Sequence, residues 1–196
     1  MKRKVTTALP ELKGYDNQGD TTGVKYYNAV PYVFNKLYLG FTQGNRIGDK
    51  VLIHSIRIKG HLTFNATNAD EAGLTRITVL WFDGDEYSVA ATMGDIIEGV
   101  TDNVIDGSVK LKHTDQYRIL ADRYFTFLPG DGKNQEKPFD IFIKIDRESH
   151  YYTATSPYDS IRKGCILIGA GSGYWETSGN NQTEIYYQTR LRFYDA

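Results

Sequence analysis

The segment from Asn45 to Phe64 constrains the fold most, because its apolar residues alternate with polar ones over a long stretch. One set of alternating positions is apolar and consists of Leu52, Ile56, Ile58, Leu62 and Phe64. After Ile53 the other set is polar and basic and consists of Ser55, Arg57, Lys59, His61 and Thr63. A period of two over so many residues predicts a half-buried β-strand over 51–64, whose second face is cationic.

The composition favours an all-β protein. The 196 residues include 15 Tyr, 9 Phe and 19 Gly. Aromatic residues fit a pleated sheet, and glycine fits tight turns. A chain of this length can form one domain that buries about 70% of its unfolded surface. The single cysteine, Cys165, excludes an internal disulfide framework, and no apolar run is long enough to span a membrane.

Other segments show strand patterns as well. The closing segment, 182–195, alternates between an apolar set and a polar set. The apolar set is Ile185, Tyr187, Thr189, Leu191 and Phe193, and the polar set is Glu184, Tyr186, Gln188, Arg190, Arg192 and Tyr194. Further strands are predicted at 74–83, 108–113, 116–128, 139–145, 150–153 and 164–171, with a long connection from Gly84 to Gly107. About eight strands of unequal spacing predict a single eight-stranded jelly-roll sandwich with long loops.

The segments 51–64 and 182–195 each combine an apolar face with a basic face. In a jelly roll we expect them to be neighbours in one sheet, so that the basic residues of both would lie side by side. Directly opposed like charges destabilise a sheet, and a phosphate backbone would supply the counter-charge. Tyr186 and Tyr194 on the same face would stack on bases. The alternative is a solvated sheet face that acids such as Glu184 balance, and the sequence leaves both interpretations open.

No cluster of residues predicts an enzyme. The chain has four histidines, His54, His61, His113 and His150. None has the close pairing of a metal site, and we predict that His54 is partly buried and hydrogen-bonded. The loop GAGSG at 169–173 lacks the helix that follows a dinucleotide-binding loop. The acidic WFDGDE at 81–86 favours a turn over a calcium site. We also expect Asp122 and Arg123 to pair structurally or across a subunit interface rather than to act in catalysis, and we expect no catalytic residue, metal or cofactor.

Six segments, in order, resemble the capsid proteins of circovirus-like circular Rep-encoding single-stranded DNA viruses. They are PELKGYD (10–16), RIGDKVLIHSIRIKG (46–60), TRITVLWFD (75–83), YRILADRYFTF (117–127), RKGCILIGAGS (162–172) and YYQTRLRFYD (186–195). The resemblance implies a jelly roll similar to that of satellite tobacco necrosis virus. It also implies self-assembly of 60 copies into a T=1 icosahedral virion around a single-stranded DNA genome, with assembly in the host nucleus. The host-cell receptor stays unknown, and no membrane is expected.

The resemblance places the sheet that contains the first and last strands toward the genome. The nucleic-acid-binding residues on this lumenal face would be Lys2, Arg3, Lys4, Arg57, Lys59, His61, Arg190 and Arg192. Such capsid proteins usually begin with a long arginine-rich arm. Here we expect residues 1–23 to form a flexible, truncated arm with a basic start, and residues 24–196 to form the jelly-roll capsid domain. The net charge of −1 and the short basic start indicate a removed arm or a member that packages weakly.

Two other functions fit an all-β sandwich. A lectin-like binding module would use Trp81, Trp175 and loop tyrosines as a platform for a glycan. A jelly-roll metalloenzyme of the cupin type would need several metal ligands converging inside the sandwich.

Overall fold

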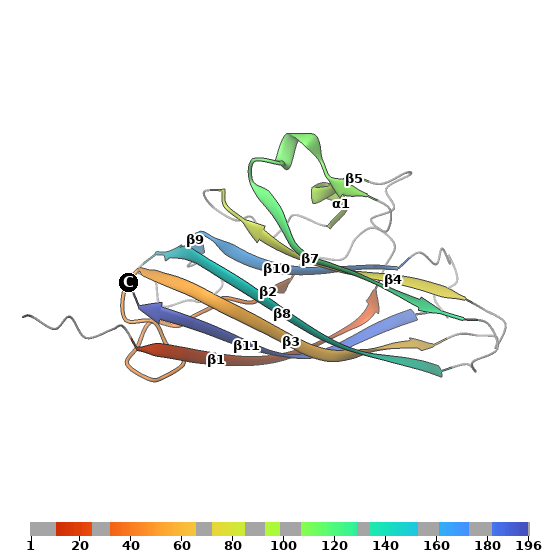
Figure 1. Ribbon diagram of the computed structural model, residues 1–196, viewed down its shortest axis with the longest axis horizontal. Helices are drawn as coiled ribbons and strands as arrows, with labels where there is room; N and C mark the ends of the chain where they lie inside the picture. The colour runs from red at the N-terminus through yellow and green to blue at the C-terminus, as the bar shows by residue number, and fades with distance from the viewer. Residues whose placement is uncertain are drawn as a thin grey trace, which may run out of the picture.

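The computed structural model describes residues 11–24, 32–65, 72–84, 93–98, 107–128, 134–152, 161–172 and 182–195. Across these ranges the chain forms a sandwich of two antiparallel sheets (Figure 1). No helix within them is both long and apolar enough to cross a membrane. The all-β class predicted from the sequence is confirmed.

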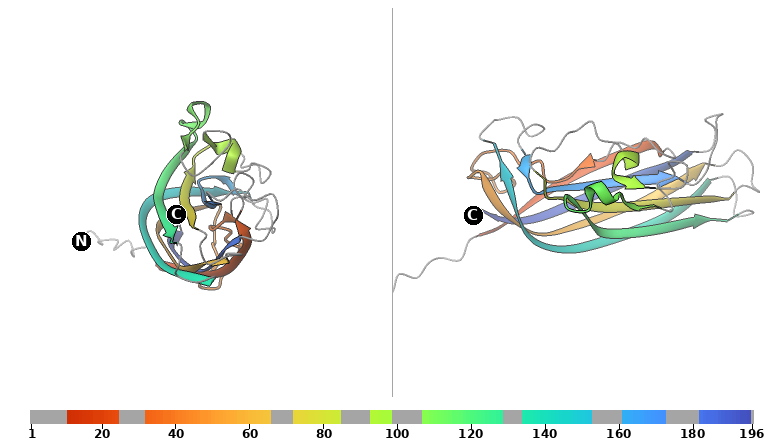
Figure 2. Two further views of the ribbon diagram at one scale, coloured as in Figure 1. Left: turned by 90° about the vertical axis from the view of Figure 1, so that its right-hand side faces the viewer. Right: turned by 90° about the horizontal axis from the view of Figure 1, so that it is seen from above.

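The larger sheet has five strands in the order β1–β11–β3–β8–β9. Their bounds are Leu12–Val24 (β1), Gln182–Asp195 (β11), Lys50–Asn65 (β3), Asn134–Tyr151 (β8) and Ile161–Lys163 (β9). The smaller sheet has the order β2–β10–β4–β7, with bounds Tyr32–Val33 (β2), Cys165–Ser172 (β10), Gly73–Phe82 (β4) and Tyr117–Phe127 (β7). Seen end-on, the two sheets curve around a common interior (Figure 2).

The strand order is that of a jelly roll. In chain order the main strands are β1, β2, β3, β4, β7, β8, β10 and β11. The larger sheet therefore contains the first, eighth, third and sixth of them, and the smaller sheet the second, seventh, fourth and fifth. Every connection crosses between the sheets except the one from β4 to β7. The predicted eight-stranded jelly roll is confirmed, with the short β9 added beside β8.

Strand β1 was not expected from the sequence. It pairs with β11 from Leu12, opposite Tyr194, to Val24, opposite Thr183. The expected boundary between arm and domain, after residue 23, therefore falls inside a strand. The prediction of an arm relied on the lack of alternating apolar residues, whereas an edge strand can be held by its backbone ladder alone. The basic residues Lys2, Arg3 and Lys4 lie outside the described residues.

The core lies between the sheets and follows the alternation in β11 and in most of β3. All five apolar positions predicted in 182–195 are buried. In β3 the residues Ile56, Ile58, Leu62 and Phe64 are fully buried, as predicted. A bulge between Ile53 and Ser55 reverses the alternation before this point, because it inserts an unpaired residue. The buried residues there are consequently Val51 and Ile53, and Leu52 is only half-buried.

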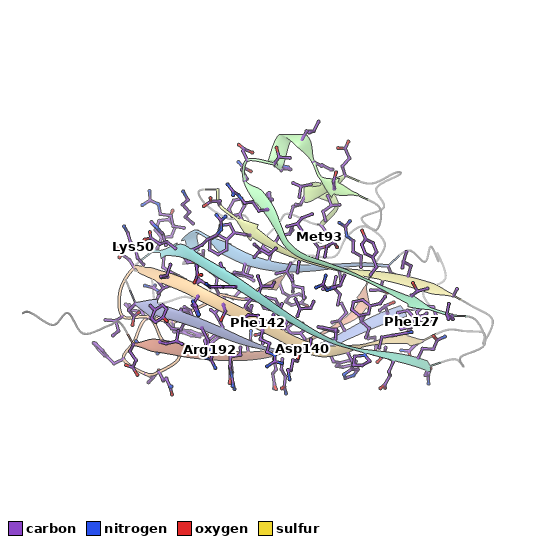
Figure 3. All side chains as sticks on the ribbon, viewed as in Figure 1. Lys50, Met93, Phe127, Asp140, Phe142 and Arg192 are labelled. Carbon is purple, nitrogen blue, oxygen red and sulfur yellow. The ribbon has the colours of Figure 1, made fainter. Side chains whose placement is uncertain are left out.

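The outer face of the smaller sheet is covered by the chain's own connection between β4 and β7. The short helix α1 (Met93–Ile96), β5 (Ile97–Glu98), β6 (Ser108–Val109) and the 3-10 turn η2 (Leu111–His113) belong to this connection, and α1 and β5 lie above β10 and β4 in Figure 1. Met93 is buried against β10, where a Cβ at Gly169 would lie only 2.0 Å from its sulfur (Figure 3).

A steric prediction follows from the close approach of β3 to β11. A Cβ at Gly60 would lie 2.0 Å from the carbonyl oxygen of Tyr186, which belongs to the backbone and cannot rotate away. We expect Gly60→Ala to lower the free energy of unfolding by about 1–3 kcal/mol, as overpacking does, in urea denaturation. The matched control is Gly14→Ala on β1, where the nearest atom would be 4.0 Å away. Equal stability of both variants would contradict the crowding at Gly60.

Candidate nucleic-acid interface

The basic residues predicted on β3 and β11 lie on one exposed surface, which we call the outer sheet face. It consists of the outward side chains of β1, β11, β3 and β8. Arg190 lies directly opposite Arg57, Gln188 opposite Lys59, and Tyr186 opposite His61. Arg192 lies opposite Ser55. The structure thus brings Arg57, Lys59, His61, Arg190 and Arg192 together, as the two alternating patterns suggested.

The outer sheet face is hollowed. One hollow of about 830 Å³ is lined by Asp16, His54, Arg57, Phe142, Arg190, Arg192 and neighbouring residues. Figure 3 labels Phe142, Asp140 and Arg192 on this sheet. A second hollow of about 630 Å³ adjoins Lys59, His61 and Tyr186, and a third of about 400 Å³ adjoins Gly14 and Arg192. The surface therefore carries three hollows and is not flat.

A carboxylate on the neighbouring strand holds each arginine of the central pair. Arg57 donates from Nε to Asp140 Oδ1 at 2.9 Å and from Nη2 to Asp140 Oδ2 at 2.6 Å. Arg190 makes the same bidentate contact with Asp16, at 2.8 and 2.7 Å. Lys59 Nζ also lies 3.5 Å from Asp140 Oδ2. Asp16, Arg190 and Arg57 form one cross-strand row, and Asp140, opposite Lys59, reaches Arg57 diagonally. The two cations therefore lie between two acids across four strands.

These contacts shift the acidity of the partners. The hydrogen bonds from Arg190 hold the pKa of Asp16 below its ordinary value of 3.8, and those from Arg57 do the same for Asp140. Because these pKa values are lowered on folding, the stabilisation is fully present above the ordinary value and is lost as the pH falls through the lowered one. At neutral pH both arginines are neutralised, so the outer sheet face is less cationic than its sequence suggests.

The sequence pointed to Glu184 as the balancing acid and missed Asp16 and Asp140. Glu184 instead accepts a hydrogen bond from the Tyr186 hydroxyl at 2.8 Å. Asp140 could have been identified from the sequence, because it occupies an outward position of the alternating segment 139–145. Asp16 lies in the segment that was expected to be an arm.

One end of the face carries flat rings. The His61 and Tyr186 rings are stacked, with centroids 5.0 Å apart and planes inclined by 18°. Lys59 lines the same hollow. Exposed rings beside a cation are suited to stacking on bases. The geometry therefore permits the predicted stacking role of Tyr186, which stays a prediction. Tyr194 instead meets His54 edge-on at 5.8 Å.

His54 is partly buried and hydrogen-bonded, as predicted. Its Nδ1 lies 2.7 Å from Asp146 Oδ1, and its side chain is 33% exposed. His150 contacts Glu148 at 3.3 Å. Within the described ranges, no group of three or more His, Cys, Asp or Glu side chains could hold a metal ion. Asp122, which we expected to form a structural pair, is bonded to Arg76, whereas Arg123 donates to the Asp122 carbonyl.

Sequence comparison finds no protein-family model and no curated protein that matches this chain. Among solved structures, the chain is similar to infectious bursal disease virus, Gx strain, with a TM-score of 0.35 and 14% identity; the match covers 100% of this chain and 36% of that chain. It is also similar to Desmodium yellow mottle tymovirus, with a TM-score of 0.34, 13% identity and coverage of 98% and 86%. A third similar structure is the VP2 subviral particle of infectious bursal disease virus, with a TM-score of 0.32, 10% identity and coverage of 100% and 36%.

Proposed function

We propose that this chain is the capsid protein of a small virus with a single-stranded DNA genome, and that its copies assemble into an icosahedral shell. The observation that carries the proposal is the complete jelly-roll strand order in both sheets. The six segments that resemble circovirus-like capsid proteins include residues of β1, β3, β4, β7, β10 and β11, all main strands of that jelly roll. The resemblance extends the proposal to 60 copies with T=1 symmetry and to assembly in the host nucleus.

The interior disfavours the two other jelly-roll functions. The space between the sheets is filled by apolar side chains such as Ile56, Ile58, Leu191 and Phe193, whereas a cupin places metal ligands there. The lectin hypothesis depended on Trp81 as part of an exposed platform. Trp81 is only 1% exposed, so it cannot contact a glycan. Its second tryptophan, Trp175, lies outside the described residues.

In the proposed shell the outer sheet face would be lumenal and would contact the genome. Its supporting features are the hollows, the stacked rings of His61 and Tyr186, and the basic residues between them. The ion pairs with Asp16 and Asp140 reduce its attraction for phosphate. We therefore regard shell formation as the primary function and DNA binding as a secondary one.

Self-assembly is tested by electron microscopy and light scattering of the purified protein. We expect closed particles of uniform size, because a capsid protein forms a closed shell from repeated copies of one interface. Metal analysis and glycan binding of the same sample test the cupin and lectin alternatives. A monomer that persists across a range of salt and pH would contradict the capsid proposal.

A further inference from the structure

We propose that phosphate groups bind the outer sheet face at the bulge of β3, between His54 and Arg192, rather than at the central arginines Arg57 and Arg190. The ligand is a phosphodiester of a single-stranded nucleic acid or a free phosphate ion. The inference deepens the proposed function and depends on it only for the identity of the biological ligand.

The arginines of the outer sheet face differ in whether a carboxylate already binds them. Arg57 and Arg190 are each held by two hydrogen bonds to a carboxylate, and an incoming phosphate would have to displace that carboxylate. Arg192 is exposed, and none of the described carboxylates forms an ion pair with it. It lines both the hollow of about 830 Å³ and the one of about 400 Å³. A phosphate can therefore reach Arg192 without breaking an existing ion pair in the described structure.

The surface beside Arg192 has room for a ligand. Arg192 lies between Gly14 of β1 and Ser55 of β3, the residues opposite it on its two neighbours. Gly14 has no side chain, and Ser55 is buried. The positions on both sides of Arg192 therefore carry nothing that stands above the sheet. This leaves room for a ligand of phosphate size beside the guanidinium, which offers phosphate a bidentate contact.

The bulge of β3 lies at His54. This residue is unpaired and is absent from the ladders with both β11 and β8. A bulge redirects the side chain that it carries, and here the ring lines the same hollow as Arg192. On β8 the opposing Asp146 has φ of 48°, a left-handed conformation that costs free energy in a residue other than glycine. The carboxylate of Asp146 lies 2.7 Å from His54 Nδ1.

The contact with Asp146 fixes the role of each ring nitrogen. Nδ1 is engaged by Asp146, so Nε2 is the nitrogen left for a ligand. A protonated imidazole donates from Nε2 to a phosphate oxygen, whereas the neutral ring with its hydrogen on Nδ1 offers only a lone pair there. Bound phosphate therefore favours the protonated form of the ring, so binding should strengthen as the pH is lowered.

The other charged groups around His54 set the background for this coupling. On β8 they are Lys144, Asp146 and Glu148, and on β11 they are Arg192 and the phenol of Tyr194. Lys144 Nζ lies 3.0 Å from Asp146 Oδ2. Hydrogen bonds from Lys144 and His54 hold the pKa of Asp146 below its ordinary value, so this carboxylate stays ionised where histidine titrates. The Asp146 carboxylate therefore remains an ionised acceptor for the Nδ1 hydrogen of His54.

The test measures the affinity of the full chain for a fluorescent decathymidylate by anisotropy, at several salt concentrations. At about pH 6, Arg192→Gln should weaken binding about tenfold and reduce the salt slope by about 0.7, the value for one phosphate contact on a single strand. The matched control is Arg190→Gln combined with Asp16→Asn, which removes the next outward arginine of the same strand together with the carboxylate that it neutralises. We expect this control to weaken binding no more than about threefold, because the pair contributes little net charge. Loss of affinity in the control that equals or exceeds that in Arg192→Gln would overturn the proposal.

A second variant tests whether the protonated ring of His54 contributes to binding. The wild-type affinity should rise as the pH falls from about 8 to about 5, and His54→Gln should flatten that dependence while leaving the affinity at the higher pH within about twofold. A pH dependence in His54→Gln equal to the wild type would refute the role of His54. Inorganic phosphate, titrated alone as a competitor, distinguishes a free-ion site from one that requires the phosphodiester chain.

Particle formation by each variant is measured separately by light scattering. Particles that form normally but bind the oligonucleotide equally in wild type and Arg192→Gln would reject this phosphate site and keep the capsid proposal. A monomeric protein whose phosphate binding still depends on Arg192 would reject the capsid proposal and keep the site.

Discussion

Replacement of Asp122 by alanine is expected to lower the free energy of unfolding by about 3 kcal/mol, which is the lower end of the range for breaking a buried ion pair. The Arg76 side chain is only 3% exposed, and it donates from Nε and Nη2 to Asp122 at 2.8 and 2.6 Å. It also donates to the Gly107 carbonyl at 2.6 Å. Without Asp122 the buried guanidinium loses the two hydrogen bonds and the negative charge that this carboxylate supplies. We take the lower end because the Asp122 side chain is 27% exposed.

Urea denaturation of a double-mutant cycle separates the lost charge pair from lost packing. Arg76→Met combined with Asp122→Ala removes both charges and should recover part of the stability lost by Asp122→Ala alone. Asp140→Asn serves as the surface control, since it breaks a pair of the same geometry on an exposed face and should change stability little. An Asp122→Ala protein as stable as the Asp140→Asn protein would show that the pair does not anchor the covering connection.

Replacement of both Asp16 and Asp140 by asparagine is expected to raise the affinity for a single-stranded oligonucleotide on the order of tenfold at low salt, because it converts two neutralised arginines into available cations. The slope of log affinity against log salt should steepen by about 1.4, since each new phosphate contact adds about 0.7. The measurement is oligonucleotide anisotropy over a salt series at neutral pH.

The matched control for this variant is Glu184→Gln, which removes an acid from the same face without releasing an arginine. It should increase affinity less than either single aspartate substitution, because Glu184 is bonded to Tyr186 rather than to a cation. An unchanged salt slope in the double variant would mean that Arg57 and Arg190 do not reach the bound strand. The outer sheet face would then not bind the oligonucleotide through these two arginines.

Much of the fold could be predicted because burial imposes a period of two on strands. In β11 every alternating position was predicted, since this strand has one face on the core and one face exposed along the described length. In β3 the same reasoning failed around Leu52, because a bulge shifts the alternation by one residue and leaves no mark in the composition. The edge strand β1 escaped prediction for a different reason. Its pairing depends on a backbone ladder to β11, which its side chains do not reveal.

The candidate site could be predicted only as a set of cations. Two amphipathic patterns were enough to place Arg57 and Arg190 on exposed strand faces. Their acidic partners could not be predicted, because these depend on the register of β1 against β11 and of β8 against β3, and on how far each arginine side chain reaches. The unpaired position of His54 depends on the bulge. For these reasons the sequence suggested a cationic surface, whereas in the structure carboxylates compensate Arg57 and Arg190 and none of the described ion pairs includes Arg192.

The cover over the smaller sheet has a geometric consequence. The described parts of the connection between β4 and β7, among them α1 and β5, lie over one broad side of the sandwich (Figure 1), while the opposite side carries the hollows. The two broad faces of the sandwich therefore differ, so the chain has a distinct front and back. If copies of it join edge to edge, an inverted copy would present its covered face where its neighbours present their hollowed face.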